Sequence, residues 1–417
     1  MTSTFNSTPT AERPHIAVFG RRNAGKSTMI NFLTDQDMAL VSEVPGTTTD
    51  PVYKSMEVLP LGPVIFIDTA GIDDRGDLGS KRVEKTFRVI RKTDLALMII
   101  NNLQDIKYER NLIAKLEENS IPYLIIFNNL DNLDISKTEI SAAFDDFAPG
   151  KIILIDDYGD SKREEILTAL ASLAREGNSL DTKDKSLIAD LIKEDDLVLL
   201  IIPIDSGAPK DRLILPQMQT LRRTLDNMAQ VLVVQPDSIK SALGKLNKPP
   251  ALAVTDSQAF AEVSKLVPDQ ILLTGFSILF ARYKGDLNSY LQGANSLKNL
   301  KPGMNILVAE ACTHRKRHED IGTVKIPGWL EEIAGGSLNF DHYAGQDFPA
   351  EISNYDLAVF CGGCMINQQE VTSRIRDARE AGVPVINYGI LIAWKMGILA
   401  RAIQPFLNEV EINYGVN

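Results

Sequence analysis

The fold of the first part of this chain is decided by Gly20-Arg21-Arg22-Asn23-Ala24-Gly25-Lys26-Ser27. This segment follows the apolar run 16–19 and opens a helical pattern, which is the context that the phosphate-loop motif G-x-x-x-x-G-K-S/T requires. The glycines let the backbone wrap, so that N–H groups and the helix N-terminus face phosphate oxygens. Lys26 is placed to neutralise the outer phosphates and Ser27 to ligate Mg²⁺. The competing interpretation is a chance match.

A second part of the same site is indicated by Asp68-Thr69-Ala70-Gly71, directly after the apolar run 64–67. Asp68 stands at a strand end, where a magnesium contact belongs, and Gly71 stands where the γ-phosphate approaches. Alone, an Asp at a strand end is more often a turn or cap residue. Because it accompanies the phosphate loop, we interpret it as part of a nucleotide site.

The base of the bound nucleotide is expected to contact Asn128-Asn129-Leu130-Asp131, which follows the apolar run 123–127. This pattern resembles the Asn-Lys-x-Asp motif of GTPases, in which the final carboxylate accepts hydrogen bonds from guanine. Asn129 stands where that motif has Lys, so we expect guanine selectivity with weaker affinity. An Asx-rich turn is the alternative. The base-contacting loop should follow Ile155, but Asp156-Asp157-Tyr158 stands there, and its contact is not assigned.

A mobile switch is predicted over Pro45-Gly46-Thr47-Thr48-Thr49-Asp50. It resembles the switch that brings a threonine hydroxyl and carbonyl to Mg²⁺ when the γ-phosphate is present, with Thr48 as the preferred residue and Thr47 as the next. Gly71 is followed by Ile72 and not by a water-orienting Gln. Intrinsic hydrolysis should therefore be slow unless another positive charge stabilises the phosphates.

Short apolar runs alternate with helical patterns along the chain, which predicts α/β domains with mostly parallel sheets. The expected strands are 16–19, 64–67, 95–100, 123–127 and 152–155, then 197–202, 231–234, 251–254 and 271–273, then 305–309, 357–360 and 385–387. A polar stretch at 174–184 predicts the first boundary. The middle section shows no acid-base constellation, so we expect an association surface or a plain spacer there. The predicted domains are 1–176, including a flexible tail at 1–13, then 185–270 and 276–417.

The only cysteines of the chain are Cys312, Cys361 and Cys364. The spacing in Cys361-Gly362-Gly363-Cys364 lets both thiolates face one metal centre, and Cys312 and Cys361 each follow an expected strand end. Three soft ligands are one short of the four that close an iron-sulphur or zinc site, which leaves a replaceable position. The alternative is that the cysteines are small buried hydrophobes.

The composition is that of an ordinary globular protein, with 417 residues, 44% hydrophobic and 24% charged. A formal charge of -11 argues against a general affinity for nucleic acid or anionic membrane. Three cysteines in so long a chain suit a reducing cytoplasm, and residues 1–13 lack the features of a signal peptide. The longest apolar stretch, 197–204, is far below the roughly twenty residues of a membrane-spanning helix. We expect a cytoplasmic protein without membrane or nucleic-acid partners.

By these residues the first part resembles the GTPases of the tRNA-modification and Era type, whose Gly-Thr-Thr-Arg-Asp is close to Gly46-Thr47-Thr48-Thr49-Asp50. In those relatives an asparagine at the position of Asn23 holds a potassium ion that supplies the missing charge. The resemblance implies K⁺-stimulated GTP hydrolysis with Lys26, Asn23, Asp68 and Thr48 as catalytic residues. The alternative for Asn23 is that it only stabilises its own loop.

Over its whole length the chain resembles the [FeFe]-hydrogenase maturation GTPases. Four features occur in the same order: a GTPase loop, a middle section without a catalytic motif, Cys-x-His and a distant Cys-x-x-Cys. The segments 208–216 and 277–286 are also similar. The resemblance implies a scaffold that holds a [4Fe-4S] cluster, receives a diiron precursor made by radical-SAM maturation enzymes and delivers it to the apo-[FeFe]-hydrogenase. It also implies a homodimer formed by the middle section.

One position departs from that family, whose Cys-x-x-Cys is often preceded by His, whereas Phe360 stands here. The fourth ligand is therefore open between His314, His318 and Glu319. A carboxylate or imidazole would bind iron more weakly than thiolate and leave a replaceable position. For His318 and Glu319 the alternative is a solvated polar segment.

The predicted fold is α/β with three domains: an N-terminal P-loop GTPase (Ras/Era-like), a small α/β dimerisation module and a C-terminal α/β iron-sulphur domain. The expected cofactors are GTP or GDP, Mg²⁺, a [4Fe-4S] cluster, K⁺ and a transient diiron precursor.

Two other functions compete with this interpretation. One is a tRNA-modification or ribosome-associated GTPase with structural zinc on three cysteines and one histidine, and the other is a nucleotide-gated interaction protein with inert cysteines. We also expect the GTP state to be coupled to docking of the cluster domain. The predicted nucleotide-binding residues are Arg22, Asn23, Ala24, Gly25, Lys26, Ser27, Thr28, Asp68, Gly71, Asn128 and Asp131.

Overall fold

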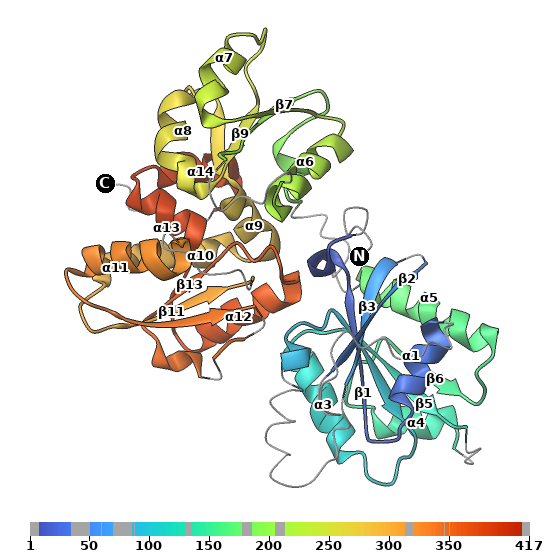
Figure 1. Cartoon of the computed structure of the whole chain (residues 1–417). Coiled ribbons are helices and arrows are strands. Elements are labelled where there is room, and N and C mark those ends of the chain that lie inside the picture. Colours follow the sequence, from blue (N-terminus) through green and yellow to red (C-terminus); the bar gives the residue numbers. More distant parts are fainter. Residues whose placement is uncertain are drawn as a thin grey trace. The chain divides into compact units, whose positions relative to one another are not determined.

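The computed structural model of the chain describes residues 8–34, 51–59, 61–69, 86, 88–130, 135–176, 186–204, 213–312, 320–345, 347–349 and 351–410. The chain divides into two compact units, Met1–Thr182 and Lys183–Asn417 (Figure 1). Both units are built from mostly parallel sheets covered by helices, which confirms the α/β class predicted from the alternating apolar runs.

The first unit contains a six-stranded sheet in the order β2-β3-β1-β4-β5-β6. Its strands are β1 (His15–Gly20), β2 (Val52–Val58), β3 (Gly62–Asp68), β4 (Leu95–Ile100), β5 (Tyr123–Asn128) and β6 (Lys151–Ile155). Neighbouring strands pair in parallel except β2 and β3, which are antiparallel. β1 is buried along its whole length between β3 and β4. The phosphate loop therefore starts at the carboxyl edge in the middle of the sheet, where ligands of such sheets gather.

Helices cover both faces of this sheet (Figure 1). They are α1 (Lys26–Thr34), α3 (Lys107–Glu118), α4 (Lys137–Ala143) and α5 (Asp160–Glu176). α1 and α5 share one core with residues such as Ile30 and Leu170, whereas α3 and α4 share the other with Ile113 and Ile140. The sheet is thus shielded from water on both sides, which explains why β1, β4 and β5 read as continuous apolar runs.

The second unit begins with a four-stranded parallel sheet in the order β10-β9-β7-β8. Its strands are β7 (Leu197–Ile201), β8 (Gln230–Val234), β9 (Leu252–Thr255) and β10 (Leu272–Gly275). The helices between them are α6 (Leu215–Asp226), α7 (Ile239–Leu243) and α8 (Phe260–Leu266). The order places β8 at an edge of the sheet, so one row of its backbone groups is free of strand partners in this sheet.

A second parallel sheet follows in the same unit, in the order β12-β11-β13-β14. Its strands are β11 (Asn305–Glu310), β12 (Asn339–Ala344), β13 (Leu357–Phe360) and β14 (Val385–Asn387). The helices of this region are α9 (Phe276–Lys284), α10 (Leu287–Ser296), α11 (Ile326–Ala334), α12 (Gln368–Glu380), α13 (Tyr388–Lys395) and α14 (Leu399–Ile403), and a π-helical turn spans Ile321–Lys325. β11 and β13 lie side by side at the centre, which brings their carboxyl ends together.

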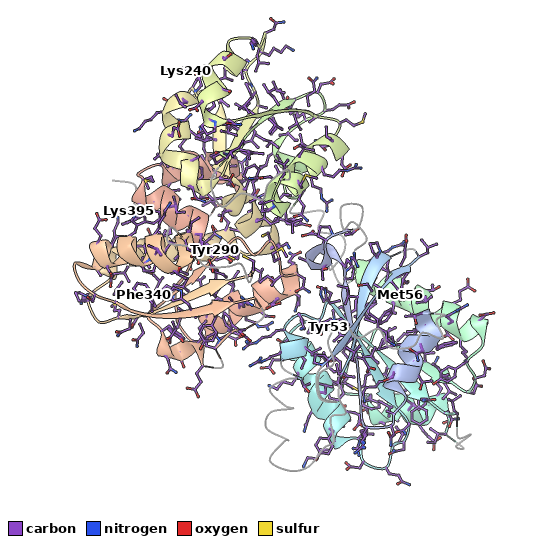
Figure 2. The ribbon with its side chains drawn as sticks, viewed as in Figure 1. Tyr53, Met56, Lys240, Tyr290, Phe340 and Lys395 are labelled. Atoms are coloured by element: carbon purple, nitrogen blue, oxygen red, sulfur yellow. The ribbon has the colours of Figure 1, made fainter. Side chains whose placement is uncertain are left out.

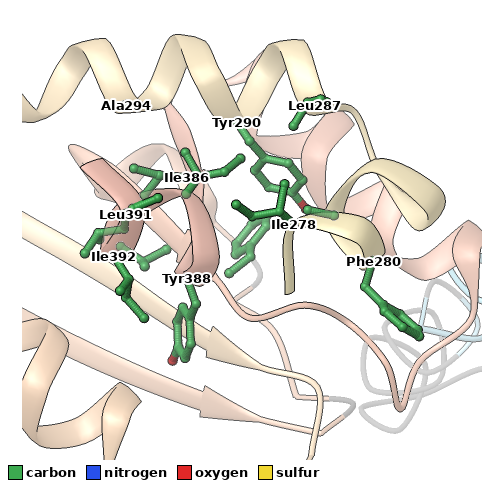
Figure 3. Close-up of a cluster of buried hydrophobic side chains, with 14 of the residues drawn as sticks. Ile278, Phe280, Leu287, Tyr290, Ala294, Ile386, Tyr388, Leu391 and Ile392 are labelled. Atoms are coloured by element: carbon green, nitrogen blue, oxygen red, sulfur yellow. The ribbon is translucent and has the colours of Figure 1, made fainter. Parts of the chain in front are cut away.

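One hydrophobic core joins the two sheets of the second unit. Figure 3 shows part of it, with Ile278 on α9, Tyr290 on α10 and Ile386 on β14 among its buried side chains. α10 packs closely on β14 because Gly293 has no side chain: a Cβ there would lie 1.8 Å from the carbonyl oxygen of Val385.

The expected strands are all present, with ends shifted by a residue or so, but β2 and β12 were not expected from the sequence. Both are edge strands, so each is shielded on one side only. Figure 2 shows side chains on these two strands, with Tyr53 and Met56 on β2 and Phe340 on β12. β2 alternates between partly and fully exposed positions along most of its length, and β12 carries Asn, Asp and His. Such strands lack the continuous apolar run that marks a buried strand.

Every helix within the described ranges is too short or too polar to traverse a lipid bilayer.

Candidate functional site

The phosphate loop joins the end of β1 to the start of α1 through a tight turn. A Cβ on Gly20 would lie 2.5 Å from the carbonyl oxygen of Ile99, so only glycine fits between β1 and β4. Asn23 and Gly25 both have positive φ values, of 61° and 97°. Positive φ is rare outside glycine, although asparagine tolerates it better than most residues. The backbone conformation of the loop therefore depends on Gly20, Asn23 and Gly25.

The Lys26 side chain is folded back onto its own loop. It is 8% exposed, and its Nζ donates to the carbonyl oxygens of Gly20 (3.0 Å) and Arg21 (2.8 Å). These carbonyls hold the ammonium at the mouth of the loop, next to the N-terminus of α1. The predicted role in neutralising phosphates needs the ammonium at this place.

Ser27 and Asp68 meet although 41 positions separate them, because β1 and β3 are neighbours in the sheet. The Ser27 hydroxyl donates to Oδ2 of Asp68. Mg²⁺ prefers hard oxygen ligands of this kind, and these two oxygens fit such an ion next to the loop. Next to Asp68, the Thr69 hydroxyl donates to the carbonyl oxygen of Val18 (2.7 Å), which fastens the end of β3 to β1.

Asn128 ties the base-binding segment to the phosphate loop. Its Nδ2 donates to the carbonyl oxygen of Ala24 (3.1 Å), and a Cβ on Gly25 would lie only 2.6 Å from that nitrogen. Asn129 is buried, and its backbone N–H donates to the carbonyl oxygen of Ile155 (2.7 Å). The segment after β5 is thus joined both to the loop and to the end of β6.

Tyr158 is a residue of this site whose contact the sequence did not reveal. Its ring packs on Phe32 of α1 with centroids 4.8 Å apart, and burial raises the pKa of its hydroxyl. The hydroxyl lies near Gly25 and near the Asn128 amide. Within the described residues, neither that hydroxyl nor Oδ1 of Asn128 has a well-formed hydrogen bond, although both are buried. The Tyr158 hydroxyl and the Asn128 amide thus face each other at the base end of the site without a well-formed hydrogen bond between them.

Arg21 anchors the loop from its other side. Its Nε donates to the buried Glu109 of α3 (2.7 Å), and its guanidinium lies over the Tyr108 ring. The hydrogen bond to Glu109 raises the pKa of Arg21. Arg22 and Thr28, both predicted to bind nucleotide, are exposed. Arg21 is thus directed at α3, which leaves Arg22 as the arginine of the loop that faces solvent.

Several predicted site residues lie outside the described residues, namely Thr48, Gly71, Asp131, His314, His318 and Glu319.

The cysteine site forms at the carboxyl ends of β11 and β13. Cys361 directly follows β13, and its backbone N–H donates to the carbonyl oxygen of Ala309 on β11 (3.1 Å). In return, the N–H of Ala311 donates to Sγ of Cys361 (3.0 Å). Cys312 follows Ala311 directly. The two neighbouring strands thus deliver cysteines that are 49 positions apart in the sequence.

A tight turn returns the chain from Cys361 to Cys364. Gly363 has φ of 68°, and a Cβ there would lie 2.9 Å from a methyl group of Val371. The N–H of Ile366 then donates to the carbonyl oxygen of Gly363 (3.3 Å). The glycine between the two cysteines is therefore needed both for the left-handed turn and for the approach of α12.

The three thiols influence one another. Burial first, and then the charges of Cys361 and Cys312, raise the pKa of Cys364 to about 12. The pKa of Cys312 is also raised to about 12, first by burial and then by Cys361 and Glu310. Each thiol thus lies within electrostatic range of the others. Sulphurs from two remote segments thus share one half-buried environment.

Within the described residues, no group of three or more His, Cys, Asp or Glu side chains is arranged to hold a metal ion. The three candidates for a fourth ligand, His314, His318 and Glu319, belong to the segment 313–319 that lies outside those residues.

Charged residues that the sequence did not single out surround the thiols. Glu310, the last residue of β11, accepts a hydrogen bond from the Tyr388 hydroxyl (3.2 Å) and raises the pKa of Cys361, although burial is the larger cause. Arg374 lowers that pKa, and it pairs with Glu370 at 2.5 Å. A carboxylate at a strand end is the same signal that revealed Asp68, so Glu310 could have been found in the sequence.

The fold and the site of the first unit define a P-loop GTPase domain. A family model described as 50S ribosome-binding GTPase matches residues 15–129. The second unit matches two models of one other family, the hydrogen maturase F dimerization domain over residues 187–285 and the hydrogen maturase F tetramerization domain over residues 288–405. Together these two models cover more than half of the chain. The chain belongs to the hydrogen maturase F (HydF) family.

Curated relatives resemble the GTPase region. The tRNA modification GTPase MnmE of Chromobacterium violaceum is 33% identical over 121 residues, which are 29% of this chain and 27% of that protein. The GTPase Der of Thermotoga neapolitana is 39% identical over 123 residues, which are 28% of each. The chain thus spans about a quarter to a third of the length of these relatives.

Among solved structures, the GTPase Era of Aquifex aeolicus bound to GDP.AlF4- is 18% identical. The match covers 61% of this chain and 97% of that one, with a TM-score of 0.31.

Proposed function

We propose that this chain is a GTP-hydrolysing scaffold that holds a [4Fe-4S] cluster, receives a diiron precursor and transfers it to apo-[FeFe]-hydrogenase. The observation that supports this most is the convergence of Cys312, Cys361 and Cys364 at the ends of two neighbouring strands, inside a region of the hydrogen maturase F family. Family membership favours this class over an RNA-modification GTPase with structural zinc. The proposed domains are 1–176 for GTP hydrolysis, 185–270 for dimerisation and 276–417 for the cluster.

The nucleotide site is proposed to act mainly by charge neutralisation. The Lys26 ammonium exchanges its loop carbonyls for the outer phosphate oxygens of GTP, and Ser27 ligates Mg²⁺ beside Asp68, with Thr48 as a further ligand. Asn128 and Asp131 are proposed to read guanine, and Gly71 to approach the γ-phosphate. The exposed, left-handed Asn23 is proposed to bind K⁺, whose positive charge would stabilise the phosphates in a site that has Ile72 in place of a water-orienting glutamine.

The cluster is proposed to bind Cys312, Cys361 and Cys364, with His314 or Glu319 as a weak fourth ligand. Bound there, it supplies an iron with an exchangeable ligand position at which a precursor can dock. The protein's part is to keep the sulphurs in place. The Ala311 N–H donates to the Cys361 sulphur, which favours the thiolate that binds iron, and the Gly363 turn fixes the second and third sulphurs relative to each other.

The partners are proposals as well. Radical-SAM maturation enzymes would supply the precursor, apo-hydrogenase would receive it, and the chain would act in the cytoplasm as a homodimer formed by the middle section. The nucleotide state is proposed to control docking, because a switch that orders around the γ-phosphate has two states. Equal affinity for these partners with GTP, GDP and no nucleotide would contradict this control.

Anaerobic purification followed by metal analysis tests the proposed function. A brown protein with iron and acid-labile sulphide in equal amounts is expected. A colourless protein that contains zinc would instead favour the RNA-modification class, and a protein that contains no metal would favour the interaction protein with inert cysteines.

A further inference from the structure

The side chain of Arg21 fastens the phosphate loop to the start of α3. Its Nε donates to Oε1 of Glu109 (2.7 Å), and its Nη2 donates to Oε2 of the same carboxylate (3.3 Å) and to the backbone carbonyl oxygen of Asp105. The guanidinium also lies over the Tyr108 ring, 5.4 Å from its centre. Glu109 is 2% exposed, and a shielded carboxylate that accepts two hydrogen bonds fixes an arginine in direction as well as in distance. A segment 88 positions away therefore sets the place of Arg21.

The backbone of Arg21 supports the Lys26 side chain. The Arg21 carbonyl oxygen accepts a hydrogen bond from Nζ of Lys26 (2.8 Å) and another from the backbone N–H of Ala24 (3.2 Å). The Lys26 ammonium also donates to the carbonyl oxygen of Gly20 (3.0 Å). Arg21 thus connects α3, through its side chain, with the Lys26 ammonium, through its carbonyl group. A shift of Arg21 would move an acceptor against which Lys26 lies.

Arg110, the residue after Glu109 on α3, makes the same kinds of contact but in another place. It donates from Nη1 to the carbonyl oxygen of Ala143 (2.7 Å), pairs with the carboxylate of Asp146 and lies over the Phe147 ring. These partners belong to the end of α4 and the segment after it. α3 is thus joined to the phosphate loop by one arginine and to the end of α4 by another, so the two contacts can be compared by experiment.

The placement of the Lys26 ammonium matters more for hydrolysis than for binding. Backbone N–H groups of a phosphate loop contact the phosphates of GDP and GTP alike, and they do not depend on that ammonium. The charge that develops on the phosphate oxygens during hydrolysis is stabilised best by groups that already stand in the right place. A misplacement of about 1 Å can lower a reaction rate about a hundredfold. Loosening Arg21 should therefore reduce turnover while nucleotide affinity changes little.

We infer that Arg21 is a positioning residue of the GTPase site: its contact with Glu109 fixes the carbonyl group on which Lys26 rests, and thereby fixes the ammonium for the outer phosphates. This inference rests on the proposed hydrolysis of GTP. It also gives the buried Glu109 an indirect part in the reaction, through Arg21.

The test measures kcat for GTP hydrolysis and, separately, the affinity for a fluorescent GDP in full-length variants. Arg21→Met alone would leave Glu109 as an uncompensated buried charge, so it is combined with Glu109→Leu, which replaces the ion pair with apolar side chains. Glu109→Gln is the milder variant, because it keeps the size and an oxygen acceptor but removes the charge. Arg110→Met is the matched control on the same helix. Thermal unfolding of each protein reports whether the domain remains folded.

We expect kcat to fall about tenfold in the double variant and by a smaller factor in Glu109→Gln, with the Kd for GDP within about threefold of the wild type in both. Arg110→Met should match the wild type in both properties. Arg21→Lys keeps the charge but lacks the planar fork that binds both carboxylate oxygens, so its kcat should lie between those of the wild type and the double variant.

The outcomes separate this inference from the proposed function. Wild-type kcat in the double variant would overturn the inference while leaving the GTPase activity intact, and if that variant does not fold, the same criterion applies to Glu109→Gln. An equal fall of kcat in Arg110→Met would also overturn it, because any loosening of α3 would then suffice. Affinity for GDP that falls as much as kcat would overturn it as well, because Arg21 would then only keep the loop folded. A wild-type protein that does not hydrolyse GTP would contradict the proposed function itself.

Discussion

The nucleotide site and the cysteine site are built in different ways. The phosphate loop is one continuous segment, and its shape follows from Gly20, Asn23 and Gly25 within it. The cysteine site needs two strands that lie 47 positions or more apart and become neighbours only when the sheet forms. A contiguous motif thus reports a local geometry, whereas a site assembled from remote segments depends on the packing of the whole domain.

Lys26→Ala should have the largest effect, and it should impair the nucleotide site while leaving the cysteine site intact. Loss of the ammonium removes the main positive charge at the phosphates, so GTP hydrolysis should fall by about a hundredfold or more. The iron content should stay at the wild-type value, because the two sites lie in separate compact units. Hydrolysis assays and iron analysis of the same preparations provide the measurement, with the exposed Arg175→Ala as control. Joint loss of both properties would show that the sites are not independent.

The cysteines of the cluster-free protein should react slowly with iodoacetamide. Burial raises the pKa of Cys312 and Cys364 to about 12, so the reactive thiolate is scarce at pH 8. The native chain should be alkylated at least about tenfold more slowly than the chain in denaturant, and its rate should rise with pH up to about 12. Mass spectrometry of each cysteine gives the rates. Equal rates in the native and denatured chains would show that the thiols are not buried together.

Potassium should stimulate hydrolysis by a smaller factor. If Asn23 holds K⁺ beside the phosphates, replacing K⁺ with Na⁺ should slow GTP hydrolysis by about tenfold, and Asn23→Ala should abolish the difference between the ions. Nucleotide affinity, measured separately with a fluorescent GDP, reports whether the loop survives the substitution. A variant that keeps its preference for K⁺ would limit Asn23 to stabilising its own loop.

Tyr158→Phe should produce the smallest effect. The substitution removes a buried hydroxyl at the base end of the site but keeps the ring on Phe32. If the hydroxyl bonds to the base, affinity for GDP should fall by about fivefold, in line with about 1 kcal/mol for one hydrogen bond. Competition between GDP and ADP measures the base preference. Unchanged affinity would mean that the hydroxyl is not part of base recognition.

Much of the fold could be predicted from the sequence, because buried parallel strands are continuous apolar runs between helices. The exceptions were the edge strands β2 and β12. The side chains of β2 alternate between partly and fully exposed positions, and β12 carries polar side chains. The sequence also located the phosphate loop, Asp68 and the three cysteines, since each belongs to a recognisable spacing or follows a strand.

The rest of the candidate sites depends on contacts that no spacing reveals. Tyr158 reaches the base end only because β6 lies beside β5. Glu310 is different, because a carboxylate at the end of an apolar strand was a signal available in the sequence.

The central claim, that sulphurs from two remote segments hold one cluster, is tested most directly by Cys312→Ser. The variant keeps Cys361 and Cys364, so any change reports on the sulphur delivered by β11. After anaerobic reconstitution and reduction, the electron paramagnetic resonance signal of the [4Fe-4S] cluster is measured in the wild type and the variant. The wild type should give a signal, and this signal should be lost or strongly diminished in the variant. A signal of the same shape and intensity in both would contradict the claim.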